Sequence, residues 1–337
     1  MRASDRARLT ALGLLAGVAA DRLAGDPRRG HPVAAFGAVA QRLETATWHD
    51  RRSAGAAFTA ILVGGATVLG LAATRLAERP LGGAQFLGGA RPGRLRGMPL
   101  VALTAAATWA VTGGTSLAAE ASAVERLLAA GDLPGARQRL THLVGRRTGH
   151  LDEAEIARAV VESVAENTSD AVVAPLLWGA VAGVPGLLAY RAINTLDAMV
   201  GHHSPRYERF GWASARLDDV ANYLPARLTA VLAAATAPVA GGSARAALAT
   251  CRRDGRQHPS PNAGVCEAAY AGALGLRLGG RNHYGSHVED RPVLGATGQP
   301  PAARDIARSV RLCRAITLAA ALTSAALALR FRRGAVR

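Results

Sequence analysis

Acidic residues between positions 155 and 170 recur at the spacing of one helix face. Glu155, Glu162, Glu166 and Asp170 follow one another at intervals of seven, four and four residues. At about 100° per residue, these positions line up along one side of a helix. Asp152 and Glu155 have the spacing of a capping box, which predicts that this helix begins just after Asp152.

Two interpretations of this carboxylate face are open, a solvated helix surface and a metal site. No arginine lies between Glu162 and Asp170, so nothing within this stretch relieves a repulsion of roughly a few tenths of a kcal/mol per pair. The face also leads into an apolar segment, where carboxylates are costly and usually functional. Mg²⁺ takes oxygen ligands and often bridges to substrate phosphates. We therefore predict that Glu162, Glu166 and Asp170 bind Mg²⁺.

A second polar segment follows an apolar stretch that is interrupted by Pro175 and Pro185. In membrane proteins such breaks are tolerated where the backbone lines an enclosed or wet cavity. His202 and His203 are adjacent, so their side chains would diverge on a helix, and we expect a loop feature rather than a metal pair. The candidate site residues of this segment are Arg191, Asn194, Asp197, Arg216, Asp218 and Asp219.

Two loop motifs add further candidates. Asp26 lies in a Gly-Asp-Pro turn followed by His31, although such a turn alone is most often only a turn. A denser loop offers imidazole, hydroxyl, amide and carboxylate within ten residues, on His258, Ser260, Asn262 and Glu267. Turn formers continue to Gly279-Gly280, which predicts structured loop between helices over residues 245–314.

The apolar segments that must position these residues indicate a membrane protein. Residues 54–74 and 98–119 carry no charged group, and each is about as long as a helix needs to cross the hydrocarbon core. Shorter charge-free stretches follow at 171–190, 228–244 and 315–329. Alternating patterns of the β type are scarce. We therefore predict an all-α, polytopic integral membrane protein with broken or re-entrant helices and polar loop regions.

A single helical membrane domain is expected over residues 1–337, with polar substrate-handling segments at 120–170, 191–227 and 245–314. The first apolar run, residues 9–20, fits either a signal peptide or an uncleaved helix that continues through Asp21. Arginine flanks the apolar segments on both sides, so the charge pattern does not select an orientation.

Composition excludes several classes of protein. The chain has 40 Lys+Arg against 24 Asp+Glu, a formal charge of +16, and every one of these cations is arginine. The absence of lysine excludes P-loop and Schiff-base chemistry. Three widely spaced cysteines exclude a disulfide scaffold. Aromatic residues are only 4% and arginines mostly flank apolar segments, so we expect no nucleic-acid partner.

Taken together, the chain from about residue 10 to 330 resembles the adenosylcobinamide-phosphate synthase family of cobalamin biosynthesis, CobD/CbiB. Two departures from the pattern are Arg147, where the family has an aspartate, and Val265-Cys266, where it usually has Trp-Pro. By this resemblance the first apolar run is an uncleaved helix. The resemblance is carried by Asp21, 25–27, 31–33, 144–146, 161–168 with Asp170, 174–176, 189–197, 210–219, 225–229, 260–264 and Glu267.

The resemblance implies an enzyme that joins a carboxylate of adenosylcobyric acid to the amine of (R)-1-amino-2-propanol phosphate, or of free aminopropanol. ATP would supply the driving force, Mg²⁺ on some of Glu162, Glu166 and Asp170 would bridge its phosphates, and the corrinoid would be substrate rather than cofactor. Arginines would hold phosphate oxygens, with Arg216 and Arg191 as candidates and Arg146 behind them. Further candidates are Asp197, Asp218 and Asp219 for a second metal or a proton, His258 and Asn262 for the corrinoid amides, and Asn167, Asn194, Ser260, Glu267, Asp26 and His31 for substrate.

We expect a multi-pass protein of the cell (inner) membrane with its active site on the cytoplasmic side, where ATP is available. Its partners would be these substrates, the lipid bilayer and other enzymes of the cobalamin pathway. The alternative is a membrane transporter of corrinoid or another large solute, because broken helices and intramembrane carboxylates also occur in transporters.

Overall fold

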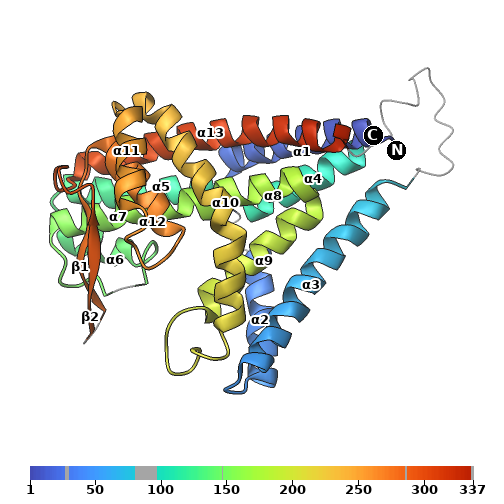
Figure 1. Ribbon diagram of the computed structural model, residues 1–337, viewed down its shortest axis with the longest axis horizontal. Helices are drawn as coiled ribbons and strands as arrows, with labels where there is room; N and C mark the ends of the chain where they lie inside the picture. Colours follow the sequence, from blue (N-terminus) through green and yellow to red (C-terminus); the bar gives the residue numbers. More distant parts are fainter. Residues whose placement is uncertain (27–29, 80–96, 146, 285–286, 335–337) are drawn as a thin grey trace. The chain divides into compact units, whose positions relative to one another are not determined.

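The computed structural model describes residues 1–26, 30–79, 97–145, 147–284 and 287–334. Over these residues the chain is a series of helices with one two-stranded hairpin, β1 (Leu278–Tyr284) and β2 (His287–Leu294) (Figure 1). The helices are α1 (Ala3–Ala24), α2 (Pro32–Thr47), α3 (Arg52–Ala77), α4 (Met98–Val111), α5 (Gly114–Ala129), α6 (Leu133–Leu140), α7 (Glu153–Thr168), η1 (Ser169–Val173), α8 (Ala174–Ala182), α9 (Val184–Val200), α10 (Trp212–Thr236), η2 (Ala237–Ala240), α11 (Ala244–Asp254), α12 (Ala263–Leu274) and α13 (Ala303–Gly334).

Four helical stretches among the described residues are long and apolar enough to cross a membrane: Arg52–Ala77, Met98–Ala129, Trp212–Ala240 and Ala303–Arg330. They contain three of the five charge-free stretches named above, at 54–74, 98–119 and 315–329, and residues 228–240 of a fourth. The fifth, residues 171–190, is broken between α8 and α9 at Gly183, whose φ of 71° lies in the left-handed region. The prediction of an all-α, polytopic membrane protein with broken helices is confirmed.

The hairpin differs from the loop predicted over residues 245–314. β1 and β2 pair antiparallel, with Gly280 opposite Arg291 and an irregular register between Leu278 and Gly280. Gly279 and Gly280 have φ values of 78° and 88°, so they form a bend within a strand rather than a turn between helices.

The chain folds into two compact units, each assembled from segments that are distant in the sequence. Unit 1 comprises residues 1–113, 175–221 and 321–337, and unit 2 comprises residues 114–174 and 222–320. The expectation of a single domain stays a prediction, and each unit is described by itself.

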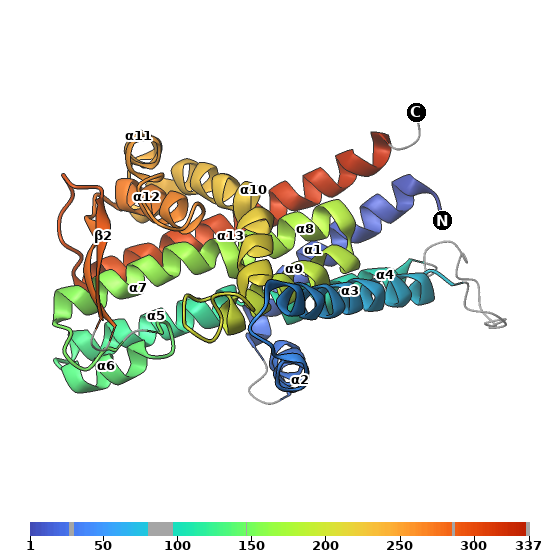
Figure 2. The same cartoon turned by 60° about the horizontal axis from the view of Figure 1, so that its bottom comes forward.

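In unit 1, helices approach closely through glycines. α1 runs along α4 and α3 along α9 (Figures 1 and 2). A Cβ atom on Gly17 would lie 2.4 Å from the Cβ of Thr108, and one on Gly70 would lie 2.7 Å from the Cα of Pro185. Such small-residue contacts are typical of helix pairs in membranes. α3 also presents a largely exposed apolar face, on which Val68 is 64% exposed.

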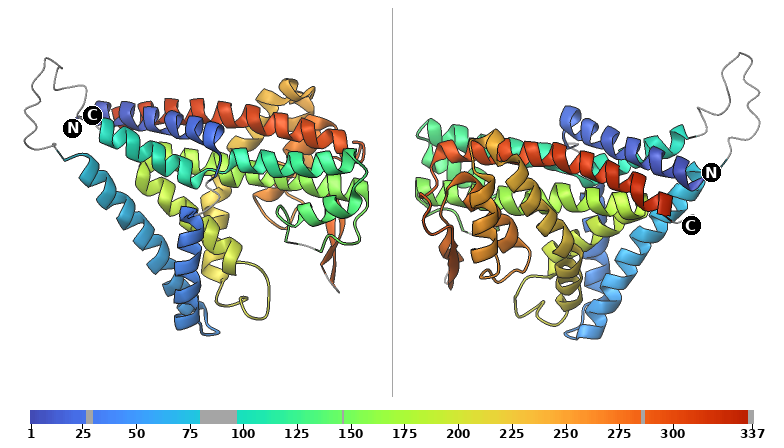
Figure 3. Two further views of the ribbon diagram at one scale, coloured as in Figure 1. Left: turned by 180° about the vertical axis from the view of Figure 1, so that it is seen from behind. Right: turned by 45° about the horizontal axis from the view of Figure 1, so that its top comes forward.

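In unit 2, α12 is the central element. All twelve of its residues are buried, and it packs against α11, α7 and the hairpin. A Cβ on Gly272 would lie 2.4 Å from the carbonyl oxygen of Ala246 on α11, so the small side chains permit this contact. α5 packs along α6 and α7 on another part of this unit (Figure 3).

A π-helical turn, η1, separates α7 from α8. It spans Ser169–Val173 and therefore contains Asp170, the last member of the carboxylate line. π-turns within α-helices are rare and occur frequently at functional sites. The extra residue in this turn changes the helical phase of Asp170 from the one that regular spacing predicts.

Candidate functional site

The start of α7 is built as the sequence predicts. Asp152 Oδ1 accepts a hydrogen bond from Glu155 N at 2.8 Å, and Glu155 Oε2 accepts one from Asp152 N at 2.9 Å. This reciprocal pair is the predicted capping box, and it satisfies two backbone N–H groups at the first turn. The box fixes the phase of the whole helix and hence the direction of its carboxylates.

Glu162 is buried and is engaged by the hairpin. Its Oε1 accepts a hydrogen bond from Gly279 N at 2.8 Å and lies 3.9 Å from Arg158 Nε. Arg158 Nη1 also donates to the Gly279 carbonyl oxygen. The sequence argument considered only residues between Glu162 and Asp170, and it therefore missed Arg158, one helical turn earlier.

Three carboxylates, on Glu166, Asp170 and Glu267, act electrostatically on the thiol of Cys266 on α12, and we call them the acidic cluster. Burial raises the pKa of Cys266 well above that of an ordinary thiol, and the negative charges of Asp170, Glu166 and Glu267 raise it further. The cysteine that departs from the family pattern is thus the residue on which the acidic cluster acts. Glu166 is exposed and Asp170 is half-buried, so both are open to a ligand.

The three predicted Mg²⁺ ligands do not form a metal cage. Over the described parts of the chain, no three His, Cys, Asp or Glu side chains are arranged to hold one ion. Glu162 also differs from Glu166 and Asp170 because its carboxylate accepts the hydrogen bond from Gly279 N. Glu166 and Asp170 fit the different case in which Mg²⁺ arrives with substrate phosphates and needs only one or two protein carboxylates.

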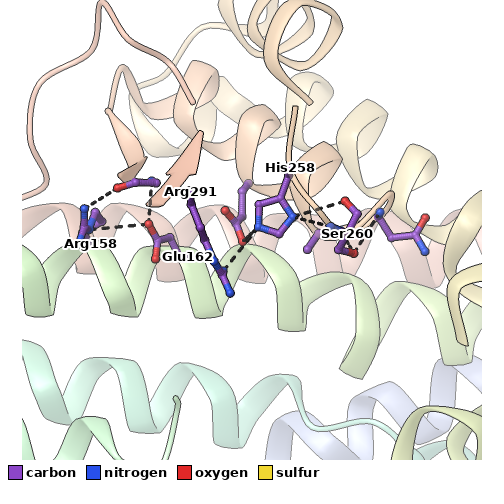
Figure 4. A network of polar contacts seen from close by, with 9 residues as sticks. Arg158, Glu162, His258, Ser260 and Arg291 are labelled. Carbon is purple, nitrogen blue, oxygen red and sulfur yellow. Dashed lines mark hydrogen bonds and ion pairs between the residues drawn. The ribbon is translucent and has the colours of Figure 1, made fainter. Parts of the chain in front are cut away.

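The loop before α12 brings His258 close to Arg291 (Figure 4) and to Glu267. Ser260 N donates to His258 Nδ1 at 3.0 Å, a shorter contact than the 3.4 Å from that nitrogen to the Ser260 carbonyl oxygen. With Nδ1 accepting, the ring proton lies on Nε2, so Nε2 faces Glu267 as a donor and does not accept from the arginine nearby. That atom lies 4.0 Å from Glu267 Oε1 and 3.5 Å from Arg291 Nη1. The His258 and Glu267 side chains are only 6% and 3% exposed.

Arg227 anchors the same loop, and the sequence argument did not select it. Its Nη1 donates to Asn262 Oδ1 at 2.8 Å, and its Nη2 donates to the Pro261 carbonyl oxygen at 3.2 Å. Its guanidinium carbon lies 3.6 Å from the centre of the Tyr223 ring. A signal existed, because Arg227 belongs to one of the blocks that carry the family resemblance. Arg158 and Arg291 lacked such a signal.

In unit 1, polar side chains of α9 and α10 form a chain of contacts. Arg191 Nη1 lies 3.2 Å from its acceptor Asn194 Oδ1, and Arg191 Nη2 donates to the Val111 carbonyl oxygen. Asn194 Nδ2 lies 3.5 Å from Asp218 Oδ1. Asp197 follows Asn194 by about one turn and is half-buried. Arg191, Asn194 and Asp218 are thus linked through their side chains, and their role in a site stays a prediction.

The other candidates of unit 1 lie nearer the surface. Arg216 Nη1 is 3.7 Å from Asp219 Oδ2, with the arginine side chain 70% exposed. His31 caps α2 by accepting a hydrogen bond from Val33 N at 3.1 Å, and its Nε2 lies 3.8 Å from Asp26 Oδ1. Pro27 and Arg146 lie outside the described residues.

The predicted site residues therefore fall into two groups. The group in unit 2 is Glu162, Glu166, Asn167, Asp170, His258, Ser260, Asn262 and Glu267. The group in unit 1 is Asp26, His31, Arg191, Asn194, Asp197, Arg216, Asp218 and Asp219. Within unit 2, Asn167 Nδ2 donates to Ser163 O at 2.9 Å and so is held against its own helix.

Each unit also contains a cavity, and of the predicted site residues in these two groups only Arg191 lines one of them. A cavity of about 460 Å³ in unit 2 is bordered by Glu155, Arg158, Arg277 and Gly279. A cavity of about 360 Å³ in unit 1 is lined by apolar residues of α2, α3, α4 and α9, together with Arg191. The first has mixed charge and the second is apolar, so they suit ligands of different character.

Comparison with known proteins adds an independent line of information. Residues 14–313 match the CobD/Cbib protein family. The chain is 50% identical over 322 residues to the "Cobalamin biosynthesis protein CobD" of Mycobacterium tuberculosis, covering 96% of this chain and 97% of the relative. Identity is 45% over 290 residues to the Rhodobacter capsulatus protein of the same name (85% and 86%) and 43% over 323 residues to that of Geobacter metallireducens (92% and 96%). No solved structure matches the chain.

Proposed function

Because this chain belongs to the CobD/Cbib family and so has an enzymatic role in cobalamin biosynthesis, we propose that it catalyses an ATP-dependent amide ligation. The substrates are adenosylcobyric acid, through one of its carboxylates, and (R)-1-amino-2-propanol phosphate or free aminopropanol, through the amine. The product is the corresponding adenosylcobinamide phosphate or adenosylcobinamide.

The chemistry requires activation of the carboxylate, which is a poor electrophile at neutral pH. Its oxygen attacks the γ-phosphorus of ATP, the bridging P–O bond breaks, and ADP leaves as the acyl phosphate, a mixed anhydride, forms. The neutral amine then attacks the acyl carbon, the C–N bond forms, and the C–O bond to phosphate breaks. The amine must lose one proton to attack and a second to become the amide, so a nearby base is needed.

The observation that carries the proposal is that two carboxylates of the acidic cluster, Glu166 at the end of α7 and Asp170 in the π-turn η1, are accessible. Glu166 and Asp170 are accessible carboxylates that suit an Mg²⁺–ATP complex or a proton from the amine. His258 and Arg291 beside Glu267 are donors suited to a phosphate or carboxylate oxygen. We assign Asp197, Asp218 and Arg191 of unit 1 as further substrate-binding residues.

The site is proposed to face the cytoplasm from the inner membrane, because ATP is supplied there. The four apolar helices support a membrane location, and the arginine-rich loops favour contact with anionic lipid. Other enzymes of the pathway are proposed partners, since they would receive the corrinoid product at the same surface.

The test is to incubate the detergent-purified protein with adenosylcobyric acid, the amine, Mg²⁺ and ATP, and to detect the product by mass spectrometry. Product that depends on ATP is expected, and parallel reactions with phosphorylated and free aminopropanol identify the amine. Glu166→Gln should lower the rate by about 10²-fold or more, because it removes a carboxylate of the acidic cluster. Glu153→Gln, at an exposed position of the same helix, is the matched control.

Absence of product in detergent, where no second compartment exists, would contradict the proposal and favour a transporter. Unchanged activity of Glu166→Gln would remove that residue from the site while leaving the reaction in place.

A further inference from the structure

The Arg158–Glu162 pair holds the hairpin from the side of α7. Glu162 Oε1 accepts from Gly279 N at 2.8 Å, and Arg158 donates to the carbonyl oxygen of the same residue. Both peptide groups of one glycine are therefore fixed by two side chains one helical turn apart. The side chains are 16% and 9% exposed, so water competes little for these contacts.

The contact point is the irregular start of β1. Gly279 and Gly280 have positive φ values, and a Cβ on Gly279 would lie 2.1 Å from the Pro292 carbonyl oxygen. A Cβ on Gly280 would lie 3.1 Å from Arg158 Nη1. The glycines thus allow β1, β2 and α7 to approach one another at this position, and a side chain there would disturb all three.

The ladder connects this point to Arg291. Gly280 is paired with Arg291 across the hairpin, so the position of the β1 start fixes the backbone of Arg291. From there the guanidinium reaches to 3.5 Å of His258 Nε2, which faces Glu267 at 4.0 Å (Figure 4). Two side chains of α7 are in this way connected to the His258–Glu267 pair through the hairpin.

We propose that Arg158 and Glu162 are positioning residues, which act through the hairpin to hold Arg291 beside His258 and Glu267. Glu162 then serves the site by fixing a backbone amide rather than by binding Mg²⁺. The activity readout of this inference rests on the proposed function, whereas its structural readout does not.

The structural test is hydrogen exchange measured by mass spectrometry on the full-length protein in detergent. Glu162→Ala should speed exchange in peptides that cover 278–280 and 291–294, because Gly279 N loses its acceptor. Arg291→Ala should leave exchange at 278–280 unchanged, since Arg291 lies downstream of the contact. Unchanged exchange in Glu162→Ala would overturn the proposal whether or not the enzyme forms the amide.

The functional test compares variants in the ligation assay. Glu162→Ala should lower kcat by up to about 10²-fold through misplacement of Arg291. The relative changes in kcat and KM should be the same in Glu162→Ala as in Arg291→Ala. The Glu162→Ala/Arg291→Ala double variant should be no slower than Arg291→Ala alone. An additive double variant would show that Glu162 acts by another route.

Conservative variants separate positioning from metal binding. Glu162→Gln keeps an oxygen that accepts from Gly279 N, so it should recover most of the activity and hydrogen-exchange protection lost in Glu162→Ala. Equal loss in Glu162→Gln and Glu162→Ala with normal exchange would mean that the negative charge itself is required, which overturns the proposal. Gly280→Ala perturbs the same contact from the hairpin and should reproduce the Glu162→Ala exchange pattern if Glu162→Ala does not fold.

Discussion

Asp254, at the end of α11, offers a sharp test of how unit 2 is held together. Its carboxylate is 6% exposed and accepts a hydrogen bond from Gly295 N at 2.9 Å. Arg253 donates to both carboxylate oxygens at 2.8 Å, although the arginine side chain is 54% exposed. Asp254→Ala removes the acceptor and leaves the Gly295 amide buried without its partner.

The expected loss follows from the Gly295 contact, because a buried hydrogen bond to a charged group contributes about 1.5–3 kcal/mol. The exposed Arg253 contact adds little. For a unit of this size, each kcal/mol lowers Tm by about 2–4 °C. Asp254→Ala should therefore lower the Tm in detergent by several degrees, and Arg253→Ala, which keeps the Gly295 bond, should lower it less.

The effect should also depend on pH with a defined sign. The hydrogen bonds from Arg253, opposed by burial and aided by the Gly295 amide, hold the pKa of Asp254 below its ordinary value. A carboxyl with a lowered folded pKa stabilises the protein fully above the unfolded pKa of about 3.9 and loses that contribution as pH falls through the folded pKa. The Tm difference between wild type and Asp254→Ala should shrink as pH falls below about 4. A difference that is constant down to pH 3, or equal loss in Arg253→Ala, would refute this reasoning.

Three further predictions concern other parts of the chain. Gly55→Ala should destabilise the protein by about 1–3 kcal/mol in thermal unfolding, because the new Cβ would lie 1.7 Å from a backbone oxygen of the loop before α10. The control is Gly64→Ala on the same helix, whose Cβ meets nothing within 4 Å and which should leave the stability unchanged. Arg227→Lys should lower kcat/KM for ligation by about tenfold, since lysine cannot reproduce the planar guanidinium that donates to two acceptors. Unchanged kinetics would show that the loop does not depend on Arg227. Alkylation followed by mass spectrometry should modify Cys251 slowly at pH 8 and faster as pH rises, because burial raises the pKa of its thiol, while Cys266 should stay unmodified.

The parts of the site that the sequence could predict are local in the chain. The capping box joins residues three positions apart, and the loop from His258 to Glu267 spans one turn and a short helix. Helical spacing and loop composition encode such contacts directly. The lengths of the charge-free apolar segments likewise predicted the membrane-spanning helices.

The parts that escaped prediction depend on distant residues. Glu162 and Gly279 are 117 positions apart, and no periodicity relates them. The contact of Arg158 with Gly279 likewise joins residues 121 positions apart. Gly279-Gly280 looked like a turn because positive φ is common to turns and bent strands. The π-turn at Asp170 also has no signature in spacing alone, since a regular helix predicts the same residues with a different phase.

The exposed apolar face of α3 has a consequence for the surrounding bilayer. The charge-free run of residues 54–74 spans about 31 Å as a helix, which matches a hydrocarbon thickness of about 30 Å. Arg51 and Arg52 precede this run and Arg75 follows it, so the guanidinium groups can reach the headgroups on both sides. The length of this run is therefore matched to the bilayer, and lengthening it by one turn of leucines would have to be accommodated by tilt or by a locally thicker bilayer.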